Sequence, residues 1–381
     1  MSDNVTAPDA GAIPFTIASR PQARFSNVQS VSNFTSGSSF APIPLVATGW
    51  LRKIELLFTA TFTCASAAAT VAGDAPWNLV SGITFSDATG SPILQTISAY
   101  NLYLVNKWLP SGTEKTDIYR PWVNPHAGPE YAYSASGASG SATFRLFIDM
   151  ELDYATAYGC IPNLDANAAL QLKIDYAIYT VAFTGTTPSA ATLSVRVSQH
   201  YWAPVATTLQ GRPVSSAPPG AGDYVETRIE NVPVSASAEN IVQTQSRGGM
   251  VQGAILVSRA AGVRTAITAG SNFGILLDNY ALFEGIPIEE WYGQIRRGTG
   301  NQGADITTSY APITAGTAAG IDRGVIPVLY QLTNSYRDTS LATRGGSLVQ
   351  YKATPGASAT TLEIVTRIIQ SKDSSAFYAR Y

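Results

Sequence analysis

Residues 144–154 read Phe-Arg-Leu-Phe-Ile-Asp-Met-Glu-Leu-Asp-Tyr, and this stretch decides the fold class. Its side chains alternate: one set is Leu146, Ile148, Met150 and Leu152, and the other is Phe147, Asp149, Glu151 and Asp153. Successive side chains of a β-strand point to opposite faces, so a period of two predicts a strand with one buried face.

The same period recurs in other short segments. Between residues 50 and 58, one predicted face carries Trp50, Ile54, Leu56 and Phe58, and the other carries Lys53 and Glu55. Residues 172–178 and 193–198 alternate in the same way. Clusters of Gly, Pro, Asn and Ser separate these runs, which is typical of a β-sandwich or jelly roll. The sequence therefore predicts an all-β protein.

The chain of 381 residues is long enough for two domains with separate cores. The alternation breaks near residues 207–224, where Pro and Gly remove ladder donors and regular backbone geometry. We predict a flexible N-terminal arm at 1–25, a first jelly roll at 26–206, a linker at 207–224, a second jelly roll at 225–370 and a C-terminal tail at 371–381.

Both predicted halves place a helix after a strand. Helical spacing follows the apolar run 80–85 between Leu94 and Trp108, and follows the run 273–277 between Ile288 and Ile295. A proline, Pro92 or Pro287, lies near each predicted helix start. Further strand pairs are expected at 144–154 with 170–183, and at 326–336 with 362–369. This order suggests two tandem jelly-roll β-sandwiches with a short helix in each half; two unrelated β-domains are the alternative.

The composition is poor in charge. Charged residues make up 13% of the chain, against about 25% in an ordinary soluble domain, and Tyr is abundant at 19 residues. Such a surface resembles the interior of protein–protein interfaces and predicts burial in an assembly. An exported protein with a Ser/Thr-rich exterior is the alternative. The net charge of −2 argues against a protein that coats nucleic acid directly, and no sequence-specific nucleic-acid partner is expected.

The N-terminus has no pattern of a secretory signal, and no apolar run approaches the roughly 20 residues that span a bilayer. Synthesis and folding in a host cytoplasm are therefore expected. The cysteines Cys64 and Cys160 lie in β-like apolar contexts and are expected to be buried free thiols.

Catalytic motifs find little support. The histidines, His126 and His200, belong to no recognisable nucleophile or metal motif. Residues 298–303 match the string Gly-x-Gly-x-x-Gly, but a helix-like segment precedes them where a dinucleotide site needs a strand. We predict no enzyme, no catalytic residue and no cofactor.

Asp149, Glu151 and Asp153 would project from one strand face about 7 Å apart. A solvated face is the preferred interpretation. They are also weak candidates for a Ca²⁺ site or an arginine-binding patch between subunits. The possible partners of such a patch are Arg296 and Arg297, or Arg323 and Arg344. A glycosidase would need two carboxylates in a cleft, whereas these follow a single strand.

Aromatic residues cluster at 200–202 and 377–381. They could stack on sugars, so a glycan-binding β-sandwich protein, a lectin or viral spike, is the main alternative function. Interface anchors or core packing are favoured for these side chains.

Several strings form a resemblance. They are Gly49-Trp50-Leu51 with Ile54-Glu55-Leu56, Asn78-Leu79-Val80 with Ile83-Thr84-Phe85-Ser86-Asp87 and Gly90, and Leu102-Tyr103-Leu104-Val105-Asn106. Together with residues 144–154 and 168–177, they are similar to the first jelly roll of tectivirus-type major capsid proteins, which are found in tailless, membrane-containing icosahedral bacteriophages. The likeness covers much of residues 45–180.

The resemblance implies a double jelly roll in the virion capsid. Homotrimeric, pseudo-hexagonal capsomers would tile an icosahedral shell around an internal membrane, beside penton and minor capsid proteins. It also implies that the N-terminal arm lies at the membrane-facing base, with Arg20 and Arg24 as its cations. The arm departs from the family, because it lacks a long, helix-prone, Gln-rich sequence.

Overall fold

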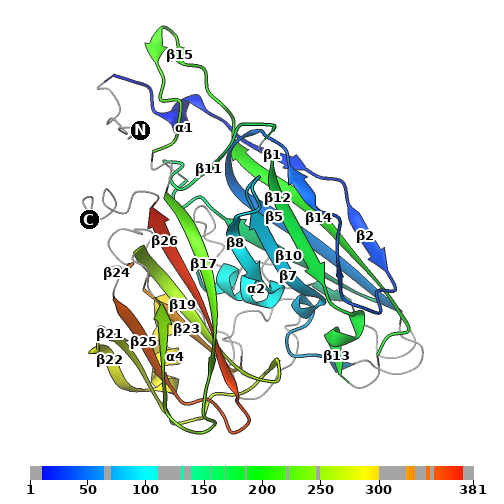
Figure 1. Cartoon of the computed structure of the whole chain (residues 1–381), viewed down its shortest axis with the longest axis vertical. Coiled ribbons are helices and arrows are strands. Elements are labelled where there is room, and N and C mark those ends of the chain that lie inside the picture. Colours follow the sequence, from blue (N-terminus) through cyan, green and yellow to red (C-terminus); the bar gives the residue numbers. More distant parts are fainter. Residues whose placement is uncertain are drawn as a thin grey trace.

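The computed structural model describes residues 11–63, 70–109, 130–132, 139–154, 156–167, 169–184, 187–219, 223–245, 249–299, 323–330, 340–343 and 347–371. Two β-rich halves lie side by side, with helix α2 (Ala99–Trp108) between them (Figure 1). The first half occupies the right of this view and the second half the lower left. No helix among the described residues is long and apolar enough to cross a membrane.

The first half consists of two sheets. The larger contains β1 (Pro21–Phe25), β2 (Gln29–Ser32), β5 (Gly49–Thr63), β9 (Glu130–Ala132), β10 (Ser139–Asp149), β11 (Ile161–Asn163) and β14 (Ala190–Trp202). Its strand order is β1-β14-β5-β10-β9, with β2 beside β14 and β11 beside β5. The smaller contains β3 (Ser38–Ser39), β4 (Ile43–Leu45), β7 (Val80–Ser86), β8 (Pro92–Ile97) and β12 (Leu170–Tyr176), in the order β3-β12-β7-β8 with β4 beside β12.

The second half also consists of two sheets. One contains β17 (Asp223–Pro233), β19 (Gly249–Ala260), β20 (Val263–Arg264), β23 (Val325–Leu329), β24 (Leu341–Thr343) and β26 (Thr361–Ser371). Its order is β17-β26-β19-β20, with β23 and β24 beside β19. The other contains β18 (Asn240–Gln245), β21 (Asn272–Leu277), β22 (Tyr280–Pro287) and β25 (Leu348–Ala353), in the order β18-β25-β21-β22. Helix α4 (Ile288–Thr299) follows β22.

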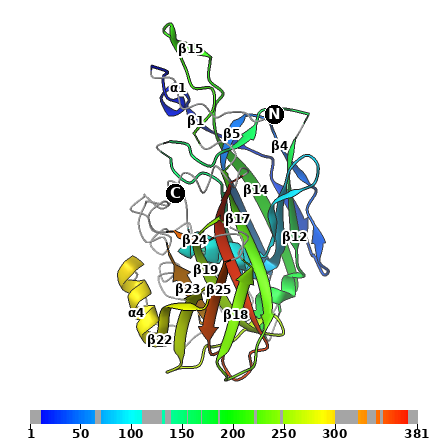
Figure 2. The same cartoon turned by 60° about the vertical axis from the view of Figure 1, so that its left-hand side comes forward.

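Smaller elements complete the described chain. These are helix α1 (Phe15–Ala18), the 3-10 turns η1 (Trp77–Leu79) and η2 (Tyr179–Ala182), the pair β6 (Thr70–Val71) with β13 (Phe183–Thr184), and the hairpin β15 (Thr208–Leu209) with β16 (Arg212–Pro213). Helix α1 and the β15–β16 hairpin lie at the same end of the molecule (Figures 1 and 2).

The halves repeat one strand order. In the larger sheets, β1-β14-β5-β10 corresponds to β17-β26-β19-β23; in the smaller sheets, β4-β12-β7-β8 corresponds to β18-β25-β21-β22. The helices α2 and α4 follow the corresponding strands β8 and β22. Two four-stranded antiparallel sheets of this connectivity form a jelly roll. The predicted double jelly roll with a short helix in each half is therefore confirmed.

The correspondence extends to single residues. In β5 the pairing with β14 skips Arg52, and in β19 the pairing with β26 skips Gln252. Each skipped residue is the fourth of its strand, so both strands carry a β-bulge at the same position. Gly49 and Gly249 begin the two strands with φ of 147° and 138°, which side chains rarely adopt.

One predicted helix start is correct and the other is wrong. Pro287 ends β22 directly before α4, as expected for a proline at a helix start. Pro92, however, begins strand β8, and α2 starts only at Ala99, where the Ser98 hydroxyl accepts a hydrogen bond from the Asn101 amide. Pairing of β8 with β7 therefore overrides the helical spacing of residues 94–98.

The predicted arm and linker contain ordered elements. Within the range 11–25, helix α1 is followed by β1, which pairs with β14 and belongs to the first jelly roll. The expected flexible arm therefore differs from the structure in its described part. The range 207–219 contains the β15–β16 hairpin. The C-terminal tail beyond Ser371 lies outside the described residues.

The predicted strand at 144–154 ends early, and its predicted partner is wrong. Strand β10 stops at Asp149, because the Arg52 carbonyl accepts hydrogen bonds from the amides of both Met150 and Glu151 at 3.0 Å. β10 pairs with β5, whereas β12 belongs to the other sheet. In the second half, β23 and β26 share a sheet but lie on opposite sides of β19.

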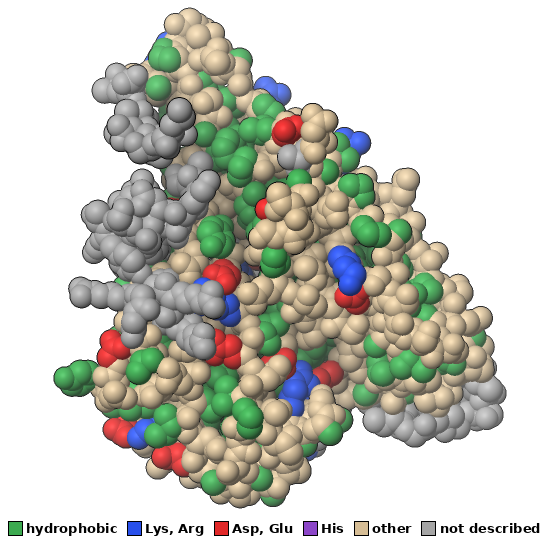
Figure 3. All heavy atoms as spheres, in the orientation of Figure 1, with side chains coloured by type: hydrophobic (Ala, Val, Ile, Leu, Met, Phe, Trp, Pro, Cys, Tyr) green, Lys and Arg blue, Asp and Glu red, His purple; other side chains and the backbone are tan. Residues whose placement is uncertain are grey.

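One large hydrophobic core runs through both halves, including Leu56 and Leu104 from the first half and Leu256 and Ile364 from the second. The long strands of both halves run in a similar upright direction (Figure 2). The face shown in Figure 3 is dominated by uncharged side chains, with few scattered charges. The halves are therefore joined as one body, and the face in Figure 3 is poor in charge.

Candidate functional site at the junction between the halves

Helix α2 is the centre of the junction. All ten of its residues are buried, including Lys107, whose exposed fraction is 1%. One side packs on its own half: Tyr103 stacks on Trp77 at 3.8 Å between ring centroids, and the Asn106 side chain bonds the backbone of Phe147. The other side packs against β19 and β26 of the second half. Because apolar side chains project from every side of α2, the helix must pack against protein on every side.

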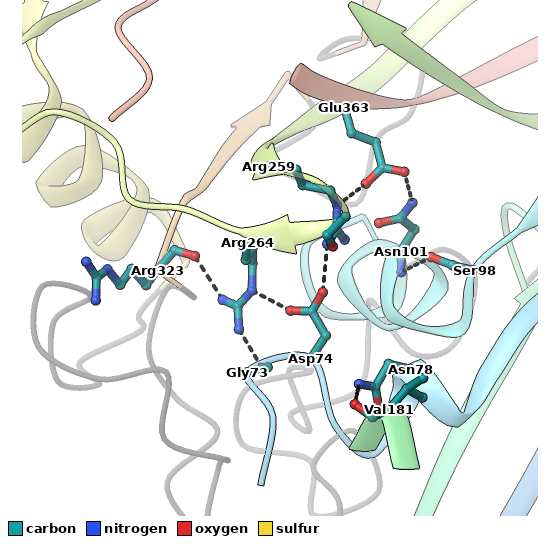
Figure 4. Close-up of polar contacts among 11 residues, drawn as sticks. Gly73, Asp74, Asn78, Ser98, Asn101, Val181, Arg259, Arg264, Arg323 and Glu363 are labelled. Carbon is teal, nitrogen blue, oxygen red and sulfur yellow. Dashed lines mark hydrogen bonds and ion pairs between the residues drawn. The ribbon is translucent and has the colours of Figure 1, made fainter. Parts of the chain in front are cut away.

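A network of charged side chains lies beside α2 (Figure 4). The Asp74 carboxylate, from the first half, accepts a hydrogen bond from Arg259 Nη1 at 2.7 Å and another from Arg264 Nε at 2.6 Å. Arg259 also donates through Nε to Glu363 at 2.6 Å. We call Asp74, Arg259, Arg264 and Glu363 the junction network. Its side chains are between 5% and 14% exposed, so these pairs are largely removed from water.

The first half supplies further contacts to the network. Arg264 Nη2 donates to the Gly73 carbonyl at 2.6 Å, and Asn101 Nδ2 of α2 donates to Glu363 Oε1 at 2.8 Å. The guanidinium carbons of Arg259 and Arg264 lie 5.5 and 5.0 Å from the Tyr100 ring centroid, within the range of cation–π attraction. These contacts fix how the second half lies on α2.

The local electrostatics favour the charged forms. Burial works against the charge of Arg259, but the carboxylates of Asp74 and Glu363 outweigh it and raise the pKa of Arg259 above its ordinary value. Charge-assisted hydrogen bonds of this kind are short and geometrically specific. The junction network can therefore hold one orientation of the halves.

A second group of contacts lies further along the junction. Arg367 of β26 donates to the carbonyl of Leu109 at 2.6 Å and to that of Asp149 at 3.3 Å, both in the first half. Burial lowers the pKa of Arg367. The Tyr158 hydroxyl donates to the carboxylate of Asp223 at the start of β17. These bonds link the halves at points beyond the junction network.

A buried polar cluster lies at the end of the first half that carries α1. Glu151 accepts two hydrogen bonds from Arg52, at 2.9 and 2.7 Å, and one from Trp202 Nε1 at 2.7 Å. The Arg52 guanidinium lies over the rings of Tyr154 and Trp202, at 4.6 and 5.0 Å. Phe15 of α1 packs edge-on against Trp202. We call Arg52, Glu151 and Trp202 the base cluster; it ties α1 to the sheet.

Cys160 packs against the base cluster. It is a buried free cysteine, as the sequence predicted, and its Sγ lies 3.7 Å from Glu151 Oε1. Burial, aided by the Glu151 charge, raises the pKa of the thiol far above its ordinary value. The thiol is therefore neutral. Cys64 lies outside the described residues.

The acidic residues proposed for a metal site do not share a face. Glu151 is buried and bonded within the base cluster, while the Asp153 carboxylate accepts a hydrogen bond from Thr156 in a turn. Asp149 remains on β10, and its carbonyl accepts from Arg367. Within the described parts of the chain, no group of three His, Cys, Asp or Glu residues could hold a metal ion. The single acidic strand face was the wrong interpretation, because β10 ends at Asp149.

The other sequence candidates are dispersed. Arg20 and Arg24 are exposed, beside α1 and on β1. His200 lies on β14 with Nε2 3.3 Å from Glu55 Oε2, and this hydrogen bond lowers the pKa of Glu55. The Arg323 carbonyl accepts from Arg264. His126, Arg344 and residues 377–381 lie outside the described residues, as do residues 300–303; Gly298 and Thr299 belong to α4, so a helix precedes this string.

The sequence analysis missed the junction network. Asp74 and Glu363 lie 289 positions apart in the chain, and no periodic pattern connects them. One signal was available: Arg259 and Arg264 flank the turn Ala260-Ala261-Gly262-Val263, which is unusual in a chain with 13% charged residues. Ala261 and Gly262 adopt φ of 48° and 82°, as a tight hairpin turn requires.

No protein-family model matches this chain, and no curated protein matches it. Solved structures do. The STIV MCP is 13% identical with a TM-score of 0.55, over 95% of this chain and 100% of that one. A chain in the atomic structure of Sulfolobus Turreted Icosahedral Virus is 13% identical with a TM-score of 0.52, over 94% and 93%. The major capsid protein P2 from bacteriophage PM2 is 10% identical with a TM-score of 0.51, over 92% and 98%. These matches confirm the double jelly-roll fold that the resemblance implied.

Proposed function

We propose that the chain is a major capsid protein, a structural subunit of an icosahedral virion shell. Three copies would form a pseudo-hexagonal capsomer, and capsomers would enclose an internal membrane beside penton and minor capsid proteins. The likeness to viral capsid proteins at full length supports this role. So does the charge-poor composition, because flanks with few charges can pack together without burying unpaired ions.

The observation that carries the trimer is the contact between the halves. It is heterologous: α2 and β8 of the first half pack on the outer face of β17, β26 and β19 of the second. Because the halves are equivalent in fold, the same contact can be made between the second half of one copy and the first half of the next. Heterologous contacts generate a closed ring when the rotation allows it. Three chains supply six wedges, which is the number a pseudo-hexagonal tile needs.

The first expected result concerns mass in solution. We expect purified protein of 40.2 kDa per chain to elute as a trimer of about 121 kDa (three times 40.2 kDa) in size-exclusion chromatography with light scattering. Electron micrographs of this species should show particles with a six-fold outline. A monomer at micromolar concentration would contradict the proposal. A monomer that is also retained on a glycan column would indicate the lectin function.

The membrane-facing base belongs to the end that carries α1 and the β15–β16 hairpin. Ile17 of α1 is 70% exposed there and Leu209 of β15 43% exposed, and the cations Arg20 and Arg212 lie just after α1 and on β16. Arg212 also donates to the Gly11 carbonyl, which joins the hairpin to the N-terminal segment. Exposed apolar groups beside cations suit the surface of an anionic bilayer.

Flotation with phosphatidylglycerol-containing vesicles tests this base. We expect the wild-type protein to float with the vesicles and the Ile17→Asp/Leu209→Asp variant to lose most of this binding. Ile241→Asp, at a site 57% exposed on β18 of the second half, is the matched control and should float normally. Equal flotation of all three proteins, or none by the wild type, would contradict this placement of the membrane.

A further inference from the structure

The two helices that follow corresponding strands differ in their cover. Helix α2 is buried on all sides, whereas within residues 288–295 of α4 the buried side chains are those of Ile288, Trp291, Tyr292 and Ile295. Glu289 and Glu290 of α4 are exposed. Each helix also bonds the neighbouring strand of its own half: Asn106 of α2 donates to the Phe147 carbonyl, and Trp291 of α4 donates to the Pro327 carbonyl.

The outer faces of the corresponding sheets also differ in their cover. In the second half, α2 lies on β19 and β26, where Ile255, Val257 and Val365 are each 0% exposed. In the first half, the corresponding face of β5 and β14 carries side chains that are only half-buried, such as Leu57 and Glu55, together with the exposed Arg196. The covered helix and the covered sheet face meet inside one chain. Among the described residues, α4 and the outer face of β5 and β14 have no such cover.

Strand register relates the two sheet faces residue by residue. Both bulges set the same alignment: Leu57 of β5 is opposite Arg196 of β14, and the corresponding Val257 of β19 is opposite Glu363 of β26. Arg196 therefore occupies the position of Glu363.

The helices can be aligned in the same way. Asn101 is the third residue of α2 and Glu290 the third residue of α4. This alignment also places Tyr103 of α2 on Tyr292 of α4, both of which pack into their own half. Within one chain, Asn101 Nδ2 donates to Glu363 Oε1 at 2.8 Å. The corresponding pair on the uncovered surfaces is Glu290 and Arg196, a carboxylate and a guanidinium.

We infer that α4 of one copy docks on the outer face of β5 and β14 of a second copy, with Glu290 bonded to Arg196. This inference rests on the proposed capsomer and names its subunit contact. The partner is a second copy of this chain, because the docking repeats a contact that the chain already makes internally.

The chemical character of the two surfaces agrees with this partner. Inside the chain, Leu104, Val105 and Trp108 follow Asn101 of α2 at helical spacing and belong to the hydrophobic core that both halves share, which suits a permanent junction. The outward face of α4 carries Glu290, and Gly293 and Gln294 beside it are half-buried. The receiving face of β5, β10 and β14 is polar: it carries the cations Lys53, Arg145 and Arg196 and the carboxylates Glu55 and Asp149.

The positions of the surfaces also fit a ring. In Figure 1, α4 and β22 lie on the left flank of the molecule, and β14 and β1 lie on the right flank. A contact between opposite flanks is heterologous, so each copy can bind one neighbour on each side. β22 brings Tyr280, which is 80% exposed, and Phe283, which is 42% exposed, to the same flank as α4. They supply apolar area around the charged pair.

Charge reversal tests the pair. We expect Arg196→Glu and Glu290→Arg each to raise the protein concentration at half-dissociation of the trimer at least about tenfold, because like charges then face each other. The variant that carries both reversals restores opposite charges and should return to within about threefold of wild type. Mass photometry across a dilution series at low and at physiological salt measures the midpoint. Circular dichroism confirms that each variant is folded.

Controls separate this inference from the capsomer itself. Lys173→Glu and Glu239→Arg reverse exposed charges away from the pair and should leave the midpoint unchanged. A wild-type protein that is monomeric would overturn the proposed capsomer. A stable wild-type trimer that both single reversals leave intact would overturn the contact but keep the capsomer. Single variants that dissociate without recovery in the double variant would overturn the pairing of Glu290 with Arg196.

Discussion

Replacing Asp74 by alanine is expected to lower the free energy of unfolding by about 3–5 kcal/mol. Asp74 is the carboxylate that both Arg259 and Arg264 contact, and the three side chains are at most 14% exposed. Its removal leaves two guanidinium groups with less compensation in a place that water reaches poorly. Glu363 still bonds Arg259, and Arg264 still donates to the backbone carbonyls of Gly73 and Arg323, but both lose their shared carboxylate. Chemical denaturation with urea measures the loss.

The same variant should separate the unfolding of the halves. Asp74 belongs to the first half and both arginines belong to the second, so the substitution acts on the junction more than on either core. We expect calorimetry to show one cooperative transition in the wild type and a broadened or split transition in the variant. Asp165→Ala, which removes an exposed carboxylate in a turn of the first half, is the control. A loss no larger than that of the control would show that the junction network contributes little to stability.

Replacing Glu151 by alanine is the second change with a large expected effect, again about 3–5 kcal/mol. The carboxylate accepts from Arg52 and Trp202, and its loss removes a buried ion pair from the Arg52 cation, whose side chain is 10% exposed. Glu151→Gln keeps the shape and part of the hydrogen bonding, so it should cost less. Urea denaturation gives the free energy.

Limited proteolysis can locate the damage caused by Glu151→Ala. Because Phe15 of α1 packs on Trp202 and is 2% exposed, we expect faster cleavage after Phe15 by chymotrypsin when the base cluster is broken. Asp175→Ala breaks an ion pair with Lys173, whose side chain is 56% exposed, and should change stability by less than about 1 kcal/mol. Equal losses in both variants would show that the base cluster behaves as a surface pair.

The sequence predicted those strands whose two faces differ. In β5 and β14, alternate residues are buried and half-exposed, so the period of two is visible in residues 50–58 and 193–198. Strand β19 has no such period, because its first ten residues are all buried between the core of the second half and the first half. Strand β22 is exposed along almost all of its length and shows no apolar face to read. Whether a strand is buried on one face or on both therefore decided whether the sequence pattern could predict it.

The junction network and the base cluster could not be predicted from short segments of the sequence. Strand β10 ends at Asp149 because of contacts with the bulge at Arg52 in β5, 97 positions earlier in the chain. The junction network joins residues that are also far apart, from Asp74 to Glu363. Such contacts depend on topology, which spacing within one segment does not encode. The sequence of α2 did indicate burial: Leu102, Tyr103, Leu104 and Val105 are consecutive, so apolar side chains point to every side of the helix. That pattern indicates burial between two bodies.

The burial of α2 has a consequence for synthesis. The helix emerges from the ribosome early, but β26, which packs on it, is the last strand of the described chain. Leu109 and Arg367, which form a hydrogen bond across the junction, are 258 residues apart. At about 5–20 residues per second, translation takes tens of seconds to supply that cover. During this interval the nascent first half exposes the apolar surface of α2, a hydrophobic patch that can bind chaperones or other nascent chains. We therefore expect translation speed and chaperone supply to influence how much of this protein reaches its native state.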